Sequence, residues 1–333
     1  MELIRNFTKL GKNDVGIAGG KGASLGEMLQ AGIPVPPGFV VLADSFEKFL
    51  GENEISADVD SILGKVNHKD TNSVDGASAE IQSIILNANF PKDIEIKVLE
   101  NFKELDAEYV AVRSSATAED GSSASWAGEL ESYLNTTKEN LLENIKKCWA
   151  SLFTPRAIFY RIEKNMHKDK VSVAVVVQKM IQSEISGVCF TVHPVTEDKN
   201  QMVIEAGFGL GEAIVGGIIT PDNYVVDKTD LLIIDVYISE QSIQIVRDKR
   251  NTPGASDPVH PGGEGTSRRT INKELPVPAK KREIQKLSGQ KIVELAKICL
   301  KIEKHYGFPC DIEWAYEKGT FYIVQSRPIT TLS

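Results

Sequence analysis

The stretch Asp311-Ile-Glu-Trp-Ala-Tyr-Glu-Lys-Gly-Thr-Phe-Tyr-Ile-Val-Gln-Ser-Arg-Pro328 predicts a β-hairpin. Apolar and aromatic runs flank a turn at Glu317-Lys318-Gly319-Thr320, where glycine favours reversal of the chain. In the register that places Glu313 opposite Gln325, Arg327 points to the same face because side chains alternate along a strand. The hairpin would then present a carboxylate, an amide oxygen and a guanidinium on one face.

The opposite face of the predicted hairpin carries Ile312, Trp314 and Val324, which we expect in a hydrophobic core. On the polar face, a carboxylate beside a neutral oxygen suits Mg2+, a hard cation that usually keeps waters and shares phosphate oxygens. A nearby arginine suits a polyphosphate because it forms paired hydrogen bonds. A solvated face with an incidental Arg–Glu pair would give the same pattern, and a slip of one residue would separate the three groups.

Length and composition are those of an ordinary globular protein. The 333 residues are 41% hydrophobic and 25% charged, and this length favours about two domains. The net charge of −8 argues against a general nucleic-acid partner, so the basic residues of an anion site must be local. The four cysteines lack CxxC spacing, which predicts buried thiols rather than a disulfide framework or a zinc site.

No membrane partner is expected either. The N-terminus has no apolar signal region, and no run approaches the roughly 20 apolar residues that a membrane span requires. We therefore expect a cytoplasmic protein.

A glycine cluster around Lys21 begins a predicted short helix. Gly19, Gly20 and Gly22 would let backbone amides approach an anion, with the helix N-terminus behind them. The alternative is a flexible helix start that carries a surface lysine.

A second basic residue, Arg113, follows an apolar strand that starts at Tyr109. A Ser/Thr-rich turn and a small-residue segment, residues 121–134, come after it. An arginine, hydroxyl groups and a mobile glycine-rich loop are what a phosphate clamp with a lid would need. An arginine that caps a neighbouring helix is the alternative.

The remaining pattern predicts the other elements. We expect mainly helices over residues 43–105, interrupted by a surface loop at 67–76, and further helices over 138–165. Two apolar strands, 171–181 and 186–194, are expected to pair as a hairpin.

Towards the C-terminus, strands are expected over residues 221–250 and a long loop from Asn251 to Pro278. An amphipathic helix from Arg282 to His305 would then lead into the C-terminal hairpin.

Four separated motifs together resemble one family. They are Gly-Gly-Lys21-Gly-Ala-Ser-Leu-Gly-Glu-Met, Val-Arg113-Ser-Ser-Ala-Thr-Ala-Glu-Asp, Asp-Ile-Glu313-Trp-Ala and Val-Gln325-Ser-Arg327-Pro. The chain looks like the N-terminal nucleotide-binding unit of phosphoenolpyruvate synthases, which pyruvate phosphate dikinases and rifampicin phosphotransferases share. Phosphoenolpyruvate synthase is the preferred parent, and the resemblance covers essentially the whole chain.

The resemblance implies an α+β ATP-grasp fold that holds ATP in a cleft between two lobes, residues 1–195 and 196–333, with the Mg2+/phosphate hairpin at 311–328. It implies that Lys21, Arg113 and Arg327 contact phosphates in catalysis. It implies further roles for six residues, with two metal ligands (Glu313, Gln325), two lid residues (Gly128, Ser132) and two adenine-hinge residues (Gln178, Met180).

The family's chemistry would be phosphoryl transfer from Mg-ATP, by way of a pyrophosphoryl group, to a histidine on a separate carrier domain and finally to pyruvate. The carrier motif Gly-Gly-x-Thr-Ser-His is absent; the nearest string, Gly262 to Arg268, has an extra residue and arginine in place of histidine. We therefore expect no phosphohistidine domain and no substrate barrel here, so that both would be partners in trans or missing from this chain.

Two classes of function remain open. The chain is an enzyme component that phosphorylates a carrier histidine, or a binding module that senses ATP without turnover. The final acceptor also stays open, because pyruvate, rifampicin or a glucan would be chosen by domains outside this unit.

Overall fold

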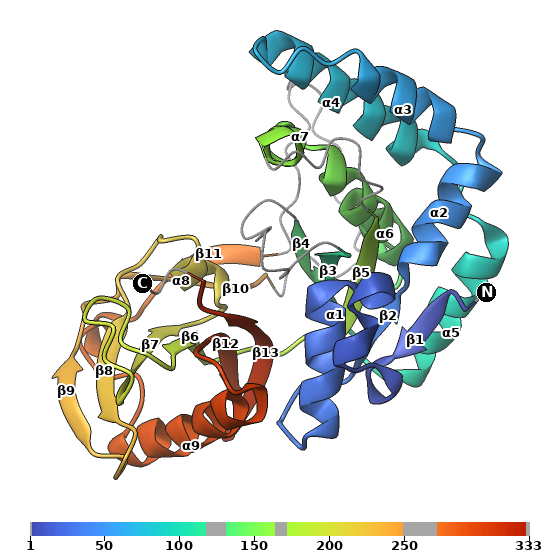
Figure 1. Ribbon diagram of the computed structural model, residues 1–333. Coiled ribbons are helices and arrows are strands. Elements are labelled where there is room, and N and C mark those ends of the chain that lie inside the picture. Colours follow the sequence, from blue (N-terminus) through green and yellow to red (C-terminus); the bar gives the residue numbers. More distant parts are fainter. Residues whose placement is uncertain (1, 118–130, 164–171, 249–271, 331–333) are drawn as a thin grey trace, which may run out of the picture. The chain divides into compact units, whose positions relative to one another are not determined.

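The computed structural model forms two compact units, residues 1–180 and 181–333 (Figure 1). Each unit combines an antiparallel sheet with helices, which agrees with the α+β class expected from the sequence. Residues 181–195, expected in the first lobe, belong to the second unit. The structure describes residues 2–117, 131–163, 172–248 and 272–330.

The first unit is built on a five-stranded sheet in the order β1-β2-β5-β3-β4. Strands β3 and β5 are buried along almost their whole length, because helices cover the sheet and leave its central strands no face toward water. The strands are β1 (Ile4–Asn6), β2 (Gly38–Val41), β3 (Val110–Ala116), β4 (Ser132–Thr136) and β5 (Val173–Lys179).

The helices of this unit enclose an aromatic core. Phe46, Phe49 and Trp149 are fully buried, and the ring centroids of Phe49 and Trp149 lie 4.8 Å apart. The helices are α1 (Val15–Gln30), α2 (Ala43–Glu52), α3 (Ser56–Gly64), α4 (Thr71–Asn87), α5 (Lys92–Glu104), α6 (Leu141–Ala150) and α7 (Pro155–Glu163), with 3-10 turns at Phe7–Lys9, Lys12–Asp14 and Ser151–Phe153.

The loop expected at residues 67–76 is shorter than predicted, because α4 already begins at Thr71. The carboxylate of Asp70 accepts a hydrogen bond of 3.0 Å from the amide of Asn72, which caps the helix start. Val74 is buried on the inner face of α4. Its burial stabilises the first turn of the helix, although the polar composition of these residues favours a loop.

The second unit contains a six-stranded antiparallel sheet in the order β13-β12-β6-β7-β8-β9 and a separate two-stranded hairpin, β10-β11. The strands are β6 (Ile185–Phe190), β7 (Gln201–Phe208), β8 (Asp222–Asp227), β9 (Ile233–Tyr237), β10 (Ile243–Arg247), β11 (Asn272–Pro276), β12 (Cys310–Glu317) and β13 (Thr320–Pro328). The helices are α8 (Glu212–Val215) and α9 (Gly289–Tyr306), with a 3-10 turn at Ala279–Lys281.

The predicted hairpin of residues 171–181 with 186–194 is wrong, since the two strands belong to different sheets. Strand β5 pairs with β2 on one edge and β3 on the other, whereas β6 pairs with β12 and β7. Each strand therefore has both hydrogen-bonding edges occupied by partners from its own unit.

The C-terminal hairpin has the predicted register between Cys310 and Glu313 on one strand and Gln325 and Pro328 on the other. Glu313 lies opposite Gln325, but a β-bulge follows at once, so that Trp314 faces Ile323. Ile323 is fully buried beside Trp314, whereas Val324, which we expected in the core, is only half-buried. The bulge inserts one extra residue in β13, and this changes which apolar side chain reaches the core.

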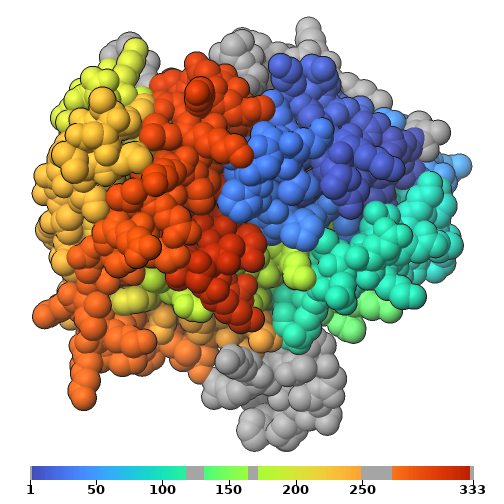
Figure 2. Space-filling view, turned by 90° about the horizontal axis from the view of Figure 1, so that it is seen from below, coloured from blue at the N-terminus to red at the C-terminus, as the bar shows by residue number. Residues whose placement is uncertain are grey.

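Helix α9 lies along one face of the six-stranded sheet (Figure 1) and at the surface of its unit, where it is orange in Figure 2. The thiol of Cys189 on β6 contacts that of Cys299 on α9, and Ile312 lies directly opposite Cys189. The helix therefore covers the face that carries Ile312 and Trp314. The alternate residues of β12, Asp311 and Glu313, lie on the other face.

Two boundaries in the second unit differ from expectation. Helix α9 starts at Gly289 rather than Arg282, because the hydroxyl of Ser288 accepts a hydrogen bond from the amide of Lys291 and caps the helix there. The loop expected up to Pro278 contains β11, which pairs with β10 from Arg247 opposite Asn272 onward. Of that predicted loop, residues 251–271 lie outside the described ranges.

All four cysteines are free and buried, as predicted. Among the described residues, no helix is long and apolar enough to cross a lipid bilayer.

A buried ion pair fastens the chain before α9 to strand β8. Lys286 Nζ lies 2.7 Å from Asp222 Oδ1, and both side chains are fully buried. Tyr224 and the amides of Ser239 and Lys286 also donate to this carboxylate, at 2.7, 3.0 and 2.8 Å. Such a pair is stable only because these hydrogen bonds replace water.

We predict that Lys286→Met destabilises the protein by about 3–5 kcal/mol, because it leaves the carboxylate of Asp222 buried without a counter-charge. The measurement is urea unfolding followed by circular dichroism, with the exposed Lys304→Met as control. The double variant Asp222→Asn/Lys286→Met should recover part of the loss. Wild-type stability in Lys286→Met would contradict the prediction.

Candidate functional site

Strands β12 and β13 bring four polar side chains onto the face of the sheet that α9 does not cover. Glu313 is directly opposite Gln325, and Asp311 is directly opposite Arg327. Arg327 donates from Nε and Nη2 to Asp311 Oδ2 at 2.9 and 2.7 Å. The structure thus unites the predicted Glu313, Gln325 and Arg327 and adds Asp311, which holds the guanidinium in place.

The row of Glu313 and Gln325 continues across the sheet. Val188 on β6 lies opposite Glu313, and Glu205 on β7 lies opposite Val188. Burial raises the pKa of Glu205, and the nearby charge of Asp311 raises it further. Burial also raises the pKa of Asp311, although Arg327 opposes this effect. The face is therefore acidic and partly shielded from water.

Sequence reasoning missed two of these carboxylates for different reasons. Asp311 stands two residues before Glu313, so alternation along the strand was a sufficient signal for placing both on one face. Glu205 had no such signal, because its place in the row follows from β7 lying beside β6, and sequence patterns do not reveal strand order.

The donors on this face suit a hard cation. Two carboxylates and an amide oxygen are oxygen ligands of the kind that Mg2+ takes. Within the described ranges, no three His, Cys, Asp or Glu side chains form a group that could hold a metal ion by themselves.

In the first unit, the glycine cluster lies against the end of β3. Helix α1 is interrupted at Gly19, whose φ of 69° and ψ of 170° are not helical. The hydroxyl of Ser115 donates to the carbonyl of Ala18 at 2.9 Å and accepts from the amide of Gly22 at 3.2 Å. A Cβ on Gly19 would stand 2.2 Å from the Ser115 hydroxyl oxygen, so only glycine allows this approach.

This contact corrects one expectation, because the amide of Gly22 is already used by Ser115 rather than directed at an anion. Gly22 also packs tightly, since a Cβ there would lie 3.0 Å from Val40. A helix does start at the glycine cluster, as predicted. It follows a preceding helical segment of α1, and the kink at Gly19 separates the two.

The charges of Lys21 and Arg113 both act on the buried thiol of Cys148 on α6. Burial raises the pKa of the Cys148 thiol, the charge of Glu131 raises it further, and the charges of Lys21 and Arg113 both lower it. Arg113 is buried on β3 and lies directly opposite Ser132 on β4. Of the predicted phosphate-binding residues in this unit, Arg113 and Ser132 are thus neighbours across two paired strands.

The predicted adenine-hinge residues lie at the end of β5, next to the boundary between the units. Gln178 is buried, and its side-chain amide donates to the carbonyl of Pro36 at 3.4 Å. The backbone amides of Lys179 and Met180 donate to the carbonyls of Pro37 and Tyr109. The predicted lid residue Gly128 lies outside the described residues, so its role stays a prediction.

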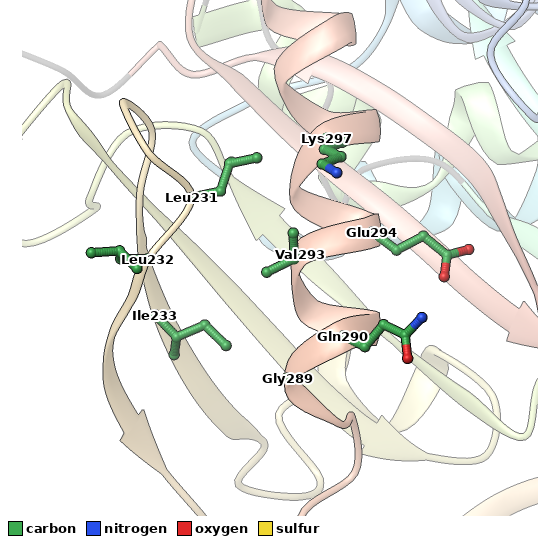
Figure 3. A pocket seen from close by; sticks show the side chains of 8 residues that line it. All are labelled: Leu231, Leu232, Ile233, Gly289, Gln290, Val293, Glu294 and Lys297. Atoms are coloured by element: carbon green, nitrogen blue, oxygen red, sulfur yellow. The ribbon is translucent and has the colours of Figure 1, made fainter.

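A groove elsewhere in the second unit lacks this chemistry. Leu231 and Ile233 point from the β9 side toward Val293 of α9, around a cavity of about 760 Å3 (Figure 3). Glu294 is a carboxylate at this groove, but Lys291 binds it at 2.8 Å. The carboxylate of this groove is therefore already paired with an ammonium group, although the amide of Gln290 also lines the groove.

Known proteins match the chain along almost its whole length. Residues 15–333 match the family described as "Pyruvate phosphate dikinase, AMP/ATP-binding domain". The chain is 45% identical to a probable phosphoenolpyruvate synthase of Methanocaldococcus jannaschii, over 100% of this chain and 27% of the relative. It is 40% identical to the phosphoenolpyruvate synthase of Pyrococcus furiosus, over 99% of this chain and 44% of the relative.

A relative with another name matches almost as well. The chain is 38% identical to the rifampicin phosphotransferase of Bacillus cereus, over 99% of this chain and 36% of the relative. The chain thus spans less than half the length of each of these curated relatives.

The raised pKa of Glu205 gives a testable pH dependence. The folded protein holds this proton to a higher pH than the unfolded chain, so the free energy of unfolding should fall as pH rises from 4.5, the ordinary value, through the raised pKa. In Glu205→Gln this part of the decline should disappear.

Urea unfolding of the nucleotide-free protein between about pH 4 and 7 measures this dependence. Glu100→Gln, which changes an exposed carboxylate on α5, is the matched control. A slope in Glu205→Gln equal to that of the wild type would show that Glu205 does not carry the effect.

Proposed function

Because the chain belongs to the family of the pyruvate phosphate dikinase AMP/ATP-binding domain, we propose that it is the Mg-ATP-binding part of a dikinase related to phosphoenolpyruvate synthase. In this proposal the two units are the lobes of an ATP-grasp fold, with the nucleotide between them. The lobes would correspond to residues 1–180 and 181–333.

The observation that carries the proposal is the pairing of Glu313 with Gln325 beside the Asp311–Arg327 ion pair. When bound, Mg2+ would neutralise phosphate charge as the transferred group moves. Glu313 and Gln325 would hold the metal from the protein side, and Asp311 would fix Arg327 toward the end of the polyphosphate.

The first unit would supply the remaining phosphate contacts. Lys21 and Arg113 are the cations, and Ser132, opposite Arg113, offers a hydroxyl at the same place. Gln178 and the backbone at Met180 would bind adenine, and Gly128 would belong to the lid. Catalysis would rest on positioning and charge neutralisation by Lys21, Arg113 and Arg327 rather than on a protein nucleophile.

The reaction that fits this site is transfer from ATP, by way of a pyrophosphoryl group, to a histidine of a carrier domain, with pyruvate as the final acceptor. The carrier and substrate domains would be supplied by other residues, in agreement with the greater length of the relatives. We place the protein in the cytoplasm, where ATP and reduced thiols such as its four free cysteines coexist.

A second candidate acceptor is rifampicin, because the relative named rifampicin phosphotransferase matches 99% of the chain. A module that senses ATP without turnover is the non-catalytic alternative. The three readings share the same ATP site, so they are separated by the reaction and not by nucleotide binding.

The proposal predicts that Glu313→Ala weakens Mg-ATP binding at least about tenfold, because it removes a metal ligand. Isothermal titration calorimetry of the purified chain measures this, with Glu240→Ala as an exposed control in the same unit. Removal of Mg2+ with EDTA should weaken wild-type binding and change Glu313→Ala much less.

Turnover is tested by adding the histidine carrier domain of a relative and measuring AMP formation. Formation of AMP by the wild type and its loss in Glu313→Ala would favour the enzyme over the sensing module. Undiminished transfer in a folded Glu313→Ala protein would refute the assigned role.

A further inference from the structure

The buried hydroxyl of Ser115 touches the backbone on both sides of Lys21. Ser115 lies on β3 and is fully buried. Its hydroxyl donates to the carbonyl of Ala18 at 2.9 Å and accepts from the amide of Gly22, 93 residues earlier in the chain, at 3.2 Å. One side chain from the sheet therefore holds the segment that carries the lysine.

The two backbone groups that Ser115 contacts are not an arbitrary pair. In an unbroken α-helix the carbonyl of residue 18 would accept directly from the amide of residue 22, four residues later. The non-helical backbone at Gly19 interrupts α1 between them. The Ser115 hydroxyl is thus inserted into one hydrogen bond of the helix, which is a recognised cause of a helix kink.

The face of the sheet that meets this kink also carries other residues of the proposed nucleotide site. Arg113 stands two residues before Ser115 on β3, so both side chains point to the same face. Ala111, two residues earlier again, lies directly opposite Gln178 on β5, and directly opposite residues share a face. The kink of α1 is therefore fastened to the strand and the face that present Arg113.

We propose that Ser115 is a positioning residue for phosphate binding, because its hydroxyl fixes the kink of α1 on β3 and so sets where Lys21 stands relative to Arg113. This inference rests on the proposed function, which assigns Lys21 and Arg113 to the phosphates. Without the hydroxyl, the carbonyl of Ala18 and the amide of Gly22 would lose their partner in a buried place. The backbone would rearrange to satisfy them, and Lys21 would move with it.

Hydrogen exchange in the nucleotide-free protein tests the structural step. Ser115→Ala should raise the exchange rate of the Gly22 amide at least about tenfold, because the acceptor of that amide is removed. Ser45→Ala is the matched control: Ser45 is also fully buried in this unit, and its hydroxyl donates to the carbonyl of Leu3 at 2.7 Å. The control should leave exchange at Gly22 as in the wild type. Unchanged exchange in Ser115→Ala would overturn the proposal.

A double-mutant cycle, measured by calorimetric titration with Mg-ATP, tests whether Ser115 acts through Lys21. We expect Ser115→Ala to weaken binding about tenfold in the wild type. In the Lys21→Ala background the same change should cost less than about twofold, because the group that it displaces is already gone. A general loss of stability would instead weaken binding equally in both backgrounds, and that outcome would refute the positioning role.

The same titrations distinguish failure of this inference from failure of the proposed function. A wild type that does not bind Mg-ATP would refute the proposed function and this inference with it. Binding that falls in Lys21→Ala but not in Ser115→Ala, or that falls equally in Ser45→Ala and Ser115→Ala, would refute this inference alone. If circular dichroism shows that Ser115→Ala is unfolded, Ser115→Cys takes its place. Its thiol is a weak donor and acceptor, so it should give a smaller loss of the same kind.

Discussion

The register of the β12-β13 hairpin is the constraint on which the second unit depends. Pairing of Glu313 with Gln325 places the polar residues of both strands on the face away from α9. The bulge that follows Glu313 brings Ile323 to Trp314, so the hairpin keeps a packed apolar face despite its polar one. A slip of one residue would exchange the two faces and expose the core.

The same pairing places carboxylates on a partly buried face, where burial makes their negative charges unfavourable. Burial disfavours the charges of Asp311 and Glu205, and Arg327 relieves only the first of these directly. Additional positive charge on this face would stabilise the ionised carboxylates. A cation on this face would therefore favour ionisation of the same carboxylates whose charge burial disfavours.

Much of the hairpin could be predicted because its signals are local. Alternation of side chains placed Glu313, Gln325 and Arg327 on one face in the register that pairs Glu313 with Gln325. At the turn, where Glu317 lies opposite Thr320, the register differs by one residue, and a bulge makes up the difference. The bulge at Val324 could not be foreseen, since no residue there demands it. The assignment of strands to sheets could not be predicted either. Strands β5 and β6 are close in sequence, but each pairs with strands elsewhere in the chain and not with the other.

The first unit shows the same limit. The glycines near Lys21 signalled a close approach of the backbone, but not that Ser115, nearly a hundred residues later, is the group approached. Likewise, the residues at the start of α4 have a composition that favours a loop. They form a helix because the cap by Asp70 and the burial of Val74 outweigh their weak helix propensity.

The pairing of β10 with β11 has a consequence for the length of the chain that connects them. Arg247 and Asn272 lie opposite each other, so the chain leaves and rejoins the hairpin at neighbouring points. Lys286 fastens the following segment to β8 independently. Doubling the length of a connection with fixed ends costs only about 0.6 kcal/mol. A change in the length of the connection between Arg247 and Asn272 would therefore cost the pairing of β10 with β11 little.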